Sequence, residues 1–400
     1  MKTYLLSAIL LFFGFAACKK SAGPPRPVIT GFSPSVGAAG TVVVIDGHFD
    51  STIQQEGIYF NGDQAKIIST SDSVIIVTVP AGVTTGKITV TVNNLSSTTD
   101  SDFVVLAGSW TQMANRPMAP NGTFNIRLGI GFAIGNYGYM GFGTDNGGDY
   151  SDLYQYDPTS NSWTTETPLG LGMENLIAMV IGNKAYVGIG ESRDLGSDTN
   201  QFYAFDPSTD TWTRKADFPG PSRSGAFAFS IGGLGYVALG DGSASTNDVW
   251  QYDPSQDLWT QKGNFPANSE IPTWGTAFSP DNKVVYLVGA YYGPGGLNPA
   301  PEVVWRYDPA SDSWTQMHNM PSSGMQDFPS SMVVNGTAYV LGGGQECWSY
   351  NQASDSWTQL AFFGTRLAGS AFAVNGLGYF GMGDQDFSDL EYIDFWKFTP

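Results

Sequence analysis

Six side chains that could bind a ligand recur at one position of the sequence, 12 or 13 residues ahead of a tyrosine. They are Arg127, Glu174, Arg223, Trp274, Asp327 and Arg366. Arginine offers a planar fork of donors to a carboxylate, and tryptophan offers a flat face to a sugar ring. If the fold gathers these positions into one ring, they could hold a carboxylated or hydroxylated ligand. The alternative is structural: salt bridges between neighbouring repeats, with Trp274 in the core.

Histidine-dependent chemistry is nearly excluded, because the chain has only two histidines, His48 and His318, which lie far apart in the sequence. A histidine-based zinc site or a Ser-His-Asp triad would depend on a single one of them. Catalysis by carboxylates stays open, since Glu174 and Asp327 could form a pair across a pocket. We expect no cofactor and no metal, because the acidic segment 145–152 lacks the closing glutamate of an EF-hand loop.

Charge and composition narrow the range of partners. The 400 residues include 18 Lys and Arg against 36 Asp and Glu, which gives a net charge of -18. Such a chain repels phosphate backbones, so nucleic acid is excluded as a partner and membrane contact requires a covalent anchor. A charged fraction of only 14%, with 50 glycines, is typical of an all-β protein that is rich in turns.

The first residues are typical of an exported chain. A short basic start precedes an apolar run, residues 5–17, that is too short to span a bilayer. The sequence F-A-A-C, which ends at Cys18, resembles a bacterial lipobox. The resemblance implies a signal peptide at residues 1–17 and a lipidated Cys18 at the head of a tether, residues 18–27. An ordinary secretory signal with an incidental cysteine is the alternative. Because residue 19 is not Asp, we expect the chain to be anchored in the outer membrane. Whether it lies on the inner side of that membrane or on the cell surface is left open.

A compact module follows at residues 28–106. Its short β-branched runs, separated by glycine turns, predict an immunoglobulin-like sandwich. The motif I-x-x-F-S-P-x-x-G begins at Ile29, and V-P-x-G begins at Val79. Both motifs resemble those of the IPT/TIG family, and in bacterial surface proteins this resemblance implies a spacer. Direct ligand binding by the module is the alternative.

Three columns of residues then repeat six times each. The first column is a tryptophan: Trp110, Trp163, Trp212, Trp259, Trp314 and Trp357. The second is an aromatic residue that mostly precedes Asp-Pro, and the third is a tyrosine ahead of a glycine-rich strand end: Tyr139, Tyr186, Tyr236, Tyr286, Tyr339 and Tyr379. Successive tryptophans lie 43 to 55 residues apart, close to the kelch period of about 50. The pattern resembles the kelch family and implies a six-bladed β-propeller of four-stranded blades at residues 108–400.

The phase of the repeats predicts how the ring closes. The array begins with a fourth strand around Trp110 and ends with a third strand around Trp396. The last blade therefore needs residues 109–113 as its outer strand, which removes an open edge.

The loops predict where a ligand binds. Turns between strands one and two and between strands three and four are short and uniform, whereas the other loops vary in length. Irregular loops at one end of a scaffold commonly carry function. We therefore expect a glycan or protein ligand at the irregular face, around the six positions ahead of the tyrosines. Kelch resemblance also leaves open a sugar mutarotase or epimerase activity that uses carboxylates at this mouth.

Overall fold

The computed structural model describes residues 26–49, 57–118, 126–145, 147–242, 246–266, 271–290, 303–321, 328–342, 346–364, 368–383 and 393–400. The expected signal peptide, Cys18, Asp327 and Arg366 lie outside these ranges. Every regular element within them is a β-strand, which confirms the all-β prediction. None of the described segments is a helix able to cross a membrane. The chain divides into two compact units, Met1–Val105 and Leu106–Pro400, which are described separately below.

Within its described residues, the first unit contains two four-stranded sheets that enclose one apolar core. One sheet has the order β1 (Val28–Ser33), β3 (Val42–His48), β7 (Val74–Thr78), β6 (Lys66–Thr70). The other has the order β5 (Asp63–Gln64), β4 (Ile58–Phe60), β8 (Ile88–Val92), β9 (Leu95–Thr98), and β10 (Val104–Val105) pairs in parallel with β2 (Val36–Gly37). Alternate residues of β3, β7 and β8 are fully buried, as expected for strands with one face on a core. The unit is therefore a β-sandwich.

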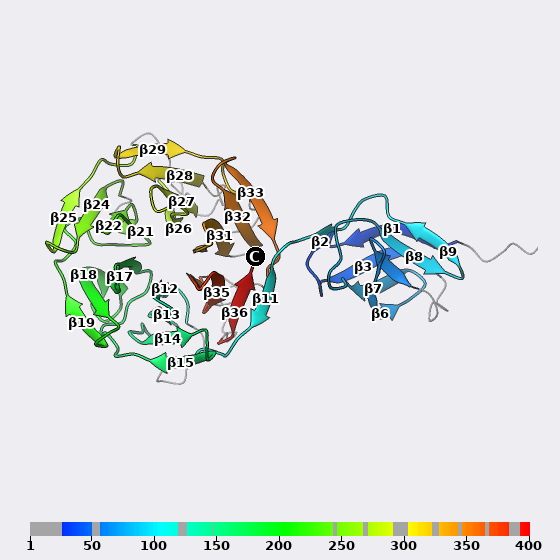
Figure 1. The fold of residues 1–400 in the computed structure, drawn as a ribbon, viewed down its shortest axis with the longest axis horizontal. Coiled ribbons are helices and arrows are strands. Elements are labelled where there is room, and N and C mark those ends of the chain that lie inside the picture. Colours follow the sequence, from blue (N-terminus) through cyan, green and yellow to red (C-terminus); the bar gives the residue numbers. More distant parts are fainter. Residues whose placement is uncertain are drawn as a thin grey trace, which may run out of the picture. The chain divides into compact units, whose positions relative to one another are not determined.

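The second unit contains six four-stranded antiparallel sheets, counted over the described residues. Figure 1 shows them arranged as a ring, with one strand of each sheet innermost. The innermost strands contact one another in sequence around the ring, and the last, β34, contacts the first, β12. This arrangement is that of a β-propeller, and each sheet is one blade.

The blades have the following strands, from the innermost outward. The first three blades are β12 (Ile130–Ile134), β13 (Tyr137–Gly141), β14 (Leu153–Asp157), β15 (Ser162–Thr165); β16 (Ile177–Ile181), β17 (Lys184–Ser192), β18 (Ser197–Asp206), β19 (Thr211–Arg214); and β21 (Phe227–Ile231), β22 (Leu234–Ala238), β24 (Val249–Asp253), β25 (Leu258–Gln261). The next two are β26 (Thr273–Phe278), β27 (Val285–Ala290), β28 (Val303–Asp308), β29 (Ser313–Gln316); and β30 (Ser330–Val334), β31 (Thr337–Gly342), β32 (Glu346–Asn351), β33 (Ser356–Leu360). A short extra pair joins β20 (Arg223–Ser224) to β23 (Asp241–Gly242).

The sixth blade combines both ends of the unit. Its strands are β34 (Ser370–Val374), β35 (Leu377–Gly381), β36 (Phe395–Thr399) and β11 (Ser109–Gln112). β11 pairs with β36 in antiparallel register, Trp110 opposite Phe398. The indole of Trp110 also packs against Phe362, Phe363 and Phe380. The first strand of the unit is thus held to the last by backbone and side chain together.

At most junctions the tryptophan column joins one blade to the next through a pair of hydrogen bonds. In this pair, the residue four positions after a tryptophan makes both bonds. Its backbone N–H donates to an Asp or Asn side chain of the next blade. Its backbone carbonyl accepts a hydrogen bond from the indole N–H of the next blade's tryptophan. Ala216 donates to Asp257 Oδ1 (3.0 Å), and Trp259 Nε1 donates to the carbonyl of Ala216 (3.0 Å). Equivalent pairs occur at Ala114, Thr167 and His318. We call this arrangement the blade staple. An exception is the junction of the third and fourth blades, where Gly263 donates to Asp312 but Trp314 Nε1 has no hydrogen-bond partner within the described residues.

The aromatic residues ahead of Asp-Pro support the same staple. Tyr252 donates its hydroxyl hydrogen bond to Asp257 Oδ1 at 2.6 Å, and Tyr307 does so to Asp312 at the same distance. The accepting Asp and Asn residues all have a φ between 47° and 52°, in the left-handed region. Asp and Asn adopt this conformation more readily than most residues. The turn that precedes each tryptophan is therefore fixed by its own backbone and by the neighbouring strand.

The second blade departs from this pattern, because Phe205 stands where the first, third, fourth and fifth blades have a tyrosine hydroxyl. Its staple aspartate, Asp210, accepts hydrogen bonds from the N–H (2.8 Å) and hydroxyl (2.7 Å) of Thr167. The buried carboxyl of Glu166 lies beside it. Burial, together with a hydrogen bond to Asp210 and its charge, raises the pKa of Glu166 to about 7. A protonated Glu166 can thus supply Asp210 with the hydrogen bond that Phe205 lacks.

An arginine occupies a position that the other repeats fill with an apolar residue. The position lies six residues after the tryptophan of each repeat. In three repeats it is occupied by Phe218, Phe265 and Met320, which are at most 2% exposed. Arg116 is their equivalent and is 3% exposed, with its guanidinium over the Tyr154 ring at 5.4 Å. No nitrogen of that guanidinium has a hydrogen-bond partner within the described residues. Burial lowers the pKa of Arg116, against the opposing effects of Tyr154 and Asp152, so burying this guanidinium costs folding free energy.

Candidate functional site

The innermost strands leave a central channel because their channel-facing residues are small. Along β12, β16 and β21 buried and half-buried residues alternate, and the half-buried positions include Gly131, Ala178 and Ala228. At Gly131 a Cβ would lie 2.8 Å from the carbonyl oxygen of Ala371, so the first and last blades approach closely at this point. The large residues at alternate positions pack between the blades instead.

A belt of left-handed residues surrounds one end of this channel, just ahead of the innermost strands. The six residues have a φ between 51° and 60°. They are Leu128, Asn175, Gly225, Trp274, Phe328 and Ala368. Four backbone hydrogen bonds between members are described. In each, the N–H of one member donates to the carbonyl of the member one blade earlier, with N···O distances of 3.0 to 3.3 Å. We call these six residues the mouth belt. Five are not glycine, so the strained backbone conformation is held by the surrounding ring.

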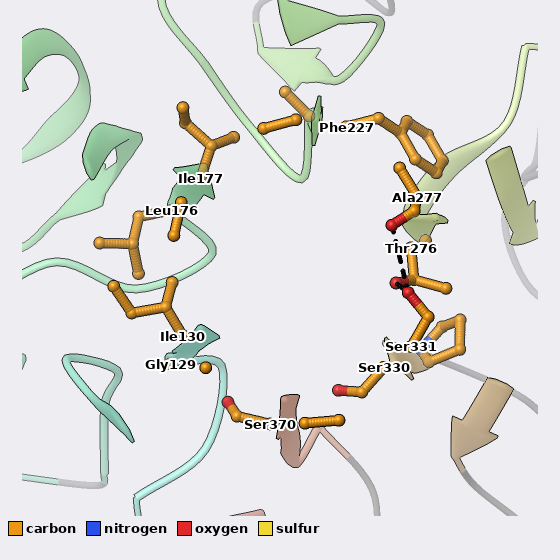
Figure 2. A pocket seen from close by; sticks show the side chains of 17 residues that line it. Gly129, Ile130, Leu176, Ile177, Phe227, Thr276, Ala277, Ser330, Ser331 and Ser370 are labelled. Carbon is orange, nitrogen blue, oxygen red and sulfur yellow. Dashed lines mark hydrogen bonds between the residues drawn. The ribbon is translucent and has the colours of Figure 1, made fainter. Parts of the chain in front are cut away.

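Two adjoining cavities occupy the channel. The mouth cavity has a volume of about 110 Å³, and all six members of the mouth belt line it. The channel cavity lies next to it, shares residues such as Leu176 and Ser330 with it, and has a volume of about 200 Å³. Figure 2 shows the channel cavity enclosed by residues from all six innermost strands. Every described residue that lines either cavity is uncharged.

The hydroxyl groups of the channel cavity gather on one side. Thr276 and Ser331 share a hydrogen bond of 2.6 Å between their hydroxyls, and Ser331 also donates to the carbonyl of Ala277 (Figure 2). Ser330 donates to the carbonyl of Gly369. Ser370 is 3% exposed, and its Oγ has no hydrogen-bond partner within the described residues.

Trp274 is the one described residue of the sequence-predicted six that lines the mouth. Its indole lies over Gly225, where a Cβ would come 2.6 Å from Cε3 of the indole, and meets the Phe328 ring edge-on at 5.3 Å. Asp327 and Arg366 lie outside the described residues.

Arg223 is fully buried and does not line the channel cavities. Its Nη2 bonds to Asp248 Oδ2 at 2.8 Å, and its Nη1 bonds to the carbonyl of Leu239 and the hydroxyl of Thr246. The guanidinium also lies over the Phe218 ring at 4.9 Å. Arg223 therefore has a structural role, but Asp248, Leu239 and Thr246 belong to its own blade, so these contacts are not the salt bridges between neighbouring repeats that the structural alternative predicts.

Glu174 and Arg127 lie at the outer side of the mouth belt, each one residue ahead of a belt member. Glu174 is 6% exposed and lies 3.5 Å from Arg193, which also bonds to Asp149. Burial and the charges of Asp149 and Glu191 together raise the pKa of Glu174 to about 7, against the opposing effect of Arg193 and Arg127. Glu174 is therefore poised to exchange a proton near neutral pH.

Sequence counting missed the hydroxyl groups of the channel and the mouth belt itself. The six predicted positions lie at the belt or one to two residues ahead of it, and a left-handed turn separates most of them from the channel. Two signals were present: the serines after Pro329 and the serine after Gly369. No cluster of His, Cys, Asp and Glu that could hold a metal ion occurs among the residues with a described position.

Comparisons with known proteins agree with the two-unit architecture. Residues 27–105 match the family model of the IPT/TIG domain. A solved structure titled "Structure of YjhT", a kelch-type β-propeller protein, has a TM-score of 0.57 with this chain at 15% sequence identity. The match covers 70% of this chain and 95% of that one. At this identity the similarity shows the fold alone. None of the curated proteins matches the chain.

Proposed function

We propose that this chain, with its IPT/TIG module and propeller fold, is an outer-membrane lipoprotein that binds a glycan at the mouth of the propeller channel. The IPT/TIG module serves as a spacer between the lipidated Cys18 and the propeller. The observation that carries the proposal is the mouth cavity, where the aromatic Trp274 and Phe328 adjoin a channel lined by hydroxyl groups. Aromatic faces beside hydroxyl groups suit a sugar ring.

The absence of charge in the described lining bears on whether the ligand is carboxylated or hydroxylated, which the sequence leaves open. A carboxylated ligand needs an available cation at the mouth, and the described lining of both cavities offers none. The five donors of Arg223 are directed into the fold. A hydroxylated, neutral ligand therefore fits better than a carboxylated one. A protein partner would meet the same mouth through the surrounding loops, and the experiment below separates the two.

A glycan array on the purified full chain, followed by thermal-shift measurement of each hit, tests this function. We expect a neutral glycan to raise the melting temperature and Trp274→Ala to abolish the shift. Tyr137→Ala is the matched control, because Tyr137 is an exposed aromatic residue at the turn between β12 and β13, at the end of β12 remote from the mouth belt. Glycan binding that survives Trp274→Ala, or binding of proteins alone, would contradict the proposal.

The proposed anchor is tested separately. Growth with a labelled fatty acid should label the wild-type chain, and Cys18→Ala should remove the label and release the chain from the membrane fraction. Label that persists in Cys18→Ala would exclude lipidation at this residue.

A second function, sugar mutarotation or epimerisation, is favoured by one observation: the pKa of about 7 at Glu174. A buried carboxyl with this pKa suits general acid–base catalysis. Exchange spectroscopy on any bound sugar would show faster interconversion of anomers with the wild-type chain than with Glu174→Gln. Equal rates for both chains would leave binding as the function.

A further inference from the structure

We propose that the tip of the β17–β18 hairpin, residues 190–199, is a proton-operated latch beside the mouth. It stays docked on the first blade while Glu174 holds a proton, and it loosens when Glu174 ionises. Glu174 directly precedes Asn175, a member of the mouth belt, so the latch lies at the rim of the mouth cavity. The latch goes beyond the proposed function and requires no ligand.

The hairpin that carries the latch is longer than its counterparts. β17 and β18 have nine and ten residues, whereas the second and third strands of the other blades have five or six. The added pairs lie beyond a register shift between Gly188 and Gly190. Two backbone hydrogen bonds between Glu174 and Glu191, of 2.9 and 3.0 Å, join this extension to the segment ahead of β16.

Arg193, in the turn of the hairpin, docks the tip on the first blade. Its backbone N–H donates to Asp149 Oδ2 at 2.7 Å, and its Nη1 donates to the carbonyl of Asp145 at 3.0 Å. Its Nε lies 3.4 Å from Asp149 Oδ1, and its Nη2 lies 3.5 Å from Glu174 Oε1. One residue of the tip thus contacts two carboxyl groups and a carbonyl outside the hairpin.

The docking contacts of the tip are polar, so undocking exposes little apolar surface. Ser192 Oγ donates to the carbonyl of Gly172 at 2.8 Å, and the N–H of Gly172 donates to Asp194 Oδ2 at 3.4 Å. Leu195, the one aliphatic side chain of the tip beyond the β-carbon, is 46% exposed. Segments with few buried apolar contacts open at a lower free energy than the core of their domain. The tip can therefore move while the blade stays folded.

Glu174 is the buried carboxyl that undocking would hydrate. It is 6% exposed. The charged groups around it come from both sides of the interface: Asp149 and Arg127 from the first blade, and Glu191 and Arg193 from the hairpin. With the tip docked, burial and the two neighbouring carboxylates raise the pKa of Glu174 to about 7, against the opposing effect of the two arginines.

The pKa difference between the docked and undocked states sets the direction of the latch. When the tip moves away, water reaches the carboxyl and Glu191 leaves with the hairpin, so the pKa of Glu174 falls towards the roughly 4.3 of a solvated glutamate. The docked state therefore binds the proton more tightly, and protonation favours docking. This advantage is complete below about pH 4.3 and is lost as the pH rises through 7.

Hydrogen–deuterium exchange of the full chain, corrected for the intrinsic pH dependence of exchange, measures docking through the amides of Glu191 and Arg193. Both amides bond across the interface, to Glu174 and Asp149. Between pH 5 and pH 8 we expect their protection to fall by about 10- to 50-fold. The amide of Tyr203, in the middle of β18, reports unfolding of the blade. An equal fall at Tyr203 would assign the change to the whole blade and overturn the latch.

Three variants identify the group that titrates. Glu174→Gln cannot ionise, so its protection at pH 8 should equal that at pH 5. Asp198→Asn is the matched control, because Asp198 lies on the same hairpin but contacts Ser224 of the third blade, and this variant should keep the fall. Arg193→Ala should lose protection at both pH values while the propeller still melts as a folded unit.

Three results would contradict the latch. Equal protection of the wild type at pH 5 and pH 8 would show that docking does not depend on a proton. Higher protection at pH 8 would show that the ion pair with Arg193 closes the tip instead. A fall that persists in Glu174→Gln would assign the pH dependence to another group. Because the free chain is measured, failure of the latch leaves the proposed glycan binding untouched, and the reverse also holds.

Discussion

At the scale of single residues, three buried ionisable side chains depart from their repeats. Glu166 replaces a missing tyrosine hydroxyl, Glu174 lies beside the mouth belt, and Arg116 replaces an apolar residue. Each is nearly enclosed, so its charge state depends on its neighbours more than on solvent. Natural sequences keep such residues where stability or function gives a reason. Two of the three lead to stability measurements.

Glu166 predicts a pH dependence of stability. Its pKa is about 7 in the fold, against roughly 4.3 in an unfolded chain. Its stabilising effect is therefore complete below pH 4.3 and is lost as the pH rises through 7. At pH 8 we expect Glu166→Gln, which keeps a neutral donor, to raise the free energy of unfolding by about 1–3 kcal/mol.

Urea unfolding of both chains at pH 4.5 and pH 8 checks this difference. The two chains should agree at the lower pH, where Glu166 is protonated in the fold. A gain of the same size at both pH values would mean that the carboxyl does not titrate in this range.

Arg116 predicts a stabilising substitution. Because its guanidinium is buried without hydrogen bonds in the described fold, Arg116→Met should raise the free energy of unfolding by about 1–4 kcal/mol. The equivalent Met320 shows that methionine fits this position of the repeat. Thermal unfolding is the measurement, and Met320→Leu serves as a near-neutral control. A destabilised Arg116→Met would show that the guanidinium is paired in solution.

At the scale of elements, the blade staple explains why the tryptophans recur. At four junctions the indole donates to the carbonyl of the preceding blade's connection, while the Asp or Asn two positions ahead of it accepts from the N–H of the same residue. The staple thus links three elements: a turn, a fourth strand and the connection from the neighbouring blade. At the closing junction, the carbonyl of Ala107 accepts from Ala361 in place of an aspartate. The motif is therefore a device for joining blades.

The staple predicts unequal effects of two substitutions at Asp257. Asp257→Ala removes the acceptor of both Ala216 and Tyr252 and should lower the free energy of unfolding by about 2–3 kcal/mol. Asp257→Asn keeps an oxygen acceptor and the left-handed preference, as Asn161 does in the first blade, and should cost less than about 1 kcal/mol. Chemical denaturation measures both. Equal losses in the two variants would show that charge, and not hydrogen bonding, holds the junction.

Sequence patterns predicted the elements better than the site. Tryptophan and tyrosine columns predict an all-β fold of repeated sheets because each column marks a side chain that packs between neighbouring blades. Phase predicts the pairing of the strand at Trp110 with the last strand, and β11 pairs with β36. The site is different, because counting residues cannot reveal the left-handed turn that places Asn175, and not Glu174, on the channel. The inward direction of the Arg223 donors likewise depends on the folded chain, which brings Leu239 and Asp248 to its guanidinium.

At the scale of the whole molecule, the second unit is stabilised as a ring. The innermost strands contact each other all the way round, and the aromatic cluster of Trp110 lies at the junction of the first and last strands. In the sixth sheet β36 is paired on both sides, with β35 and with β11, and loss of β11 would expose its outer edge. Stability of the unit should therefore depend strongly on this junction.

Deletion of residues 108–114 tests the closure. The shortened chain loses β11 and the indole of Trp110, so the propeller should melt well below the wild type, and Trp110→Ala should show a smaller loss in the same direction. Calorimetry separates this transition from that of the IPT/TIG unit, whose sheets contain none of the deleted residues. An unchanged propeller transition would mean that β36 does not need its partner strand.

The mouth belt has a consequence for how this protein could acquire new specificities. Its links run through backbone N–H and carbonyl groups, so the ring at the mouth does not depend on which side chains its members carry. The members already range from Gly225 to Trp274. Exchanging the side chains of the members other than Gly225, where an added Cβ would meet the Trp274 indole at 2.6 Å, would therefore alter what the mouth recognises while the backbone links stay in place, which makes these five positions suitable for a designed library.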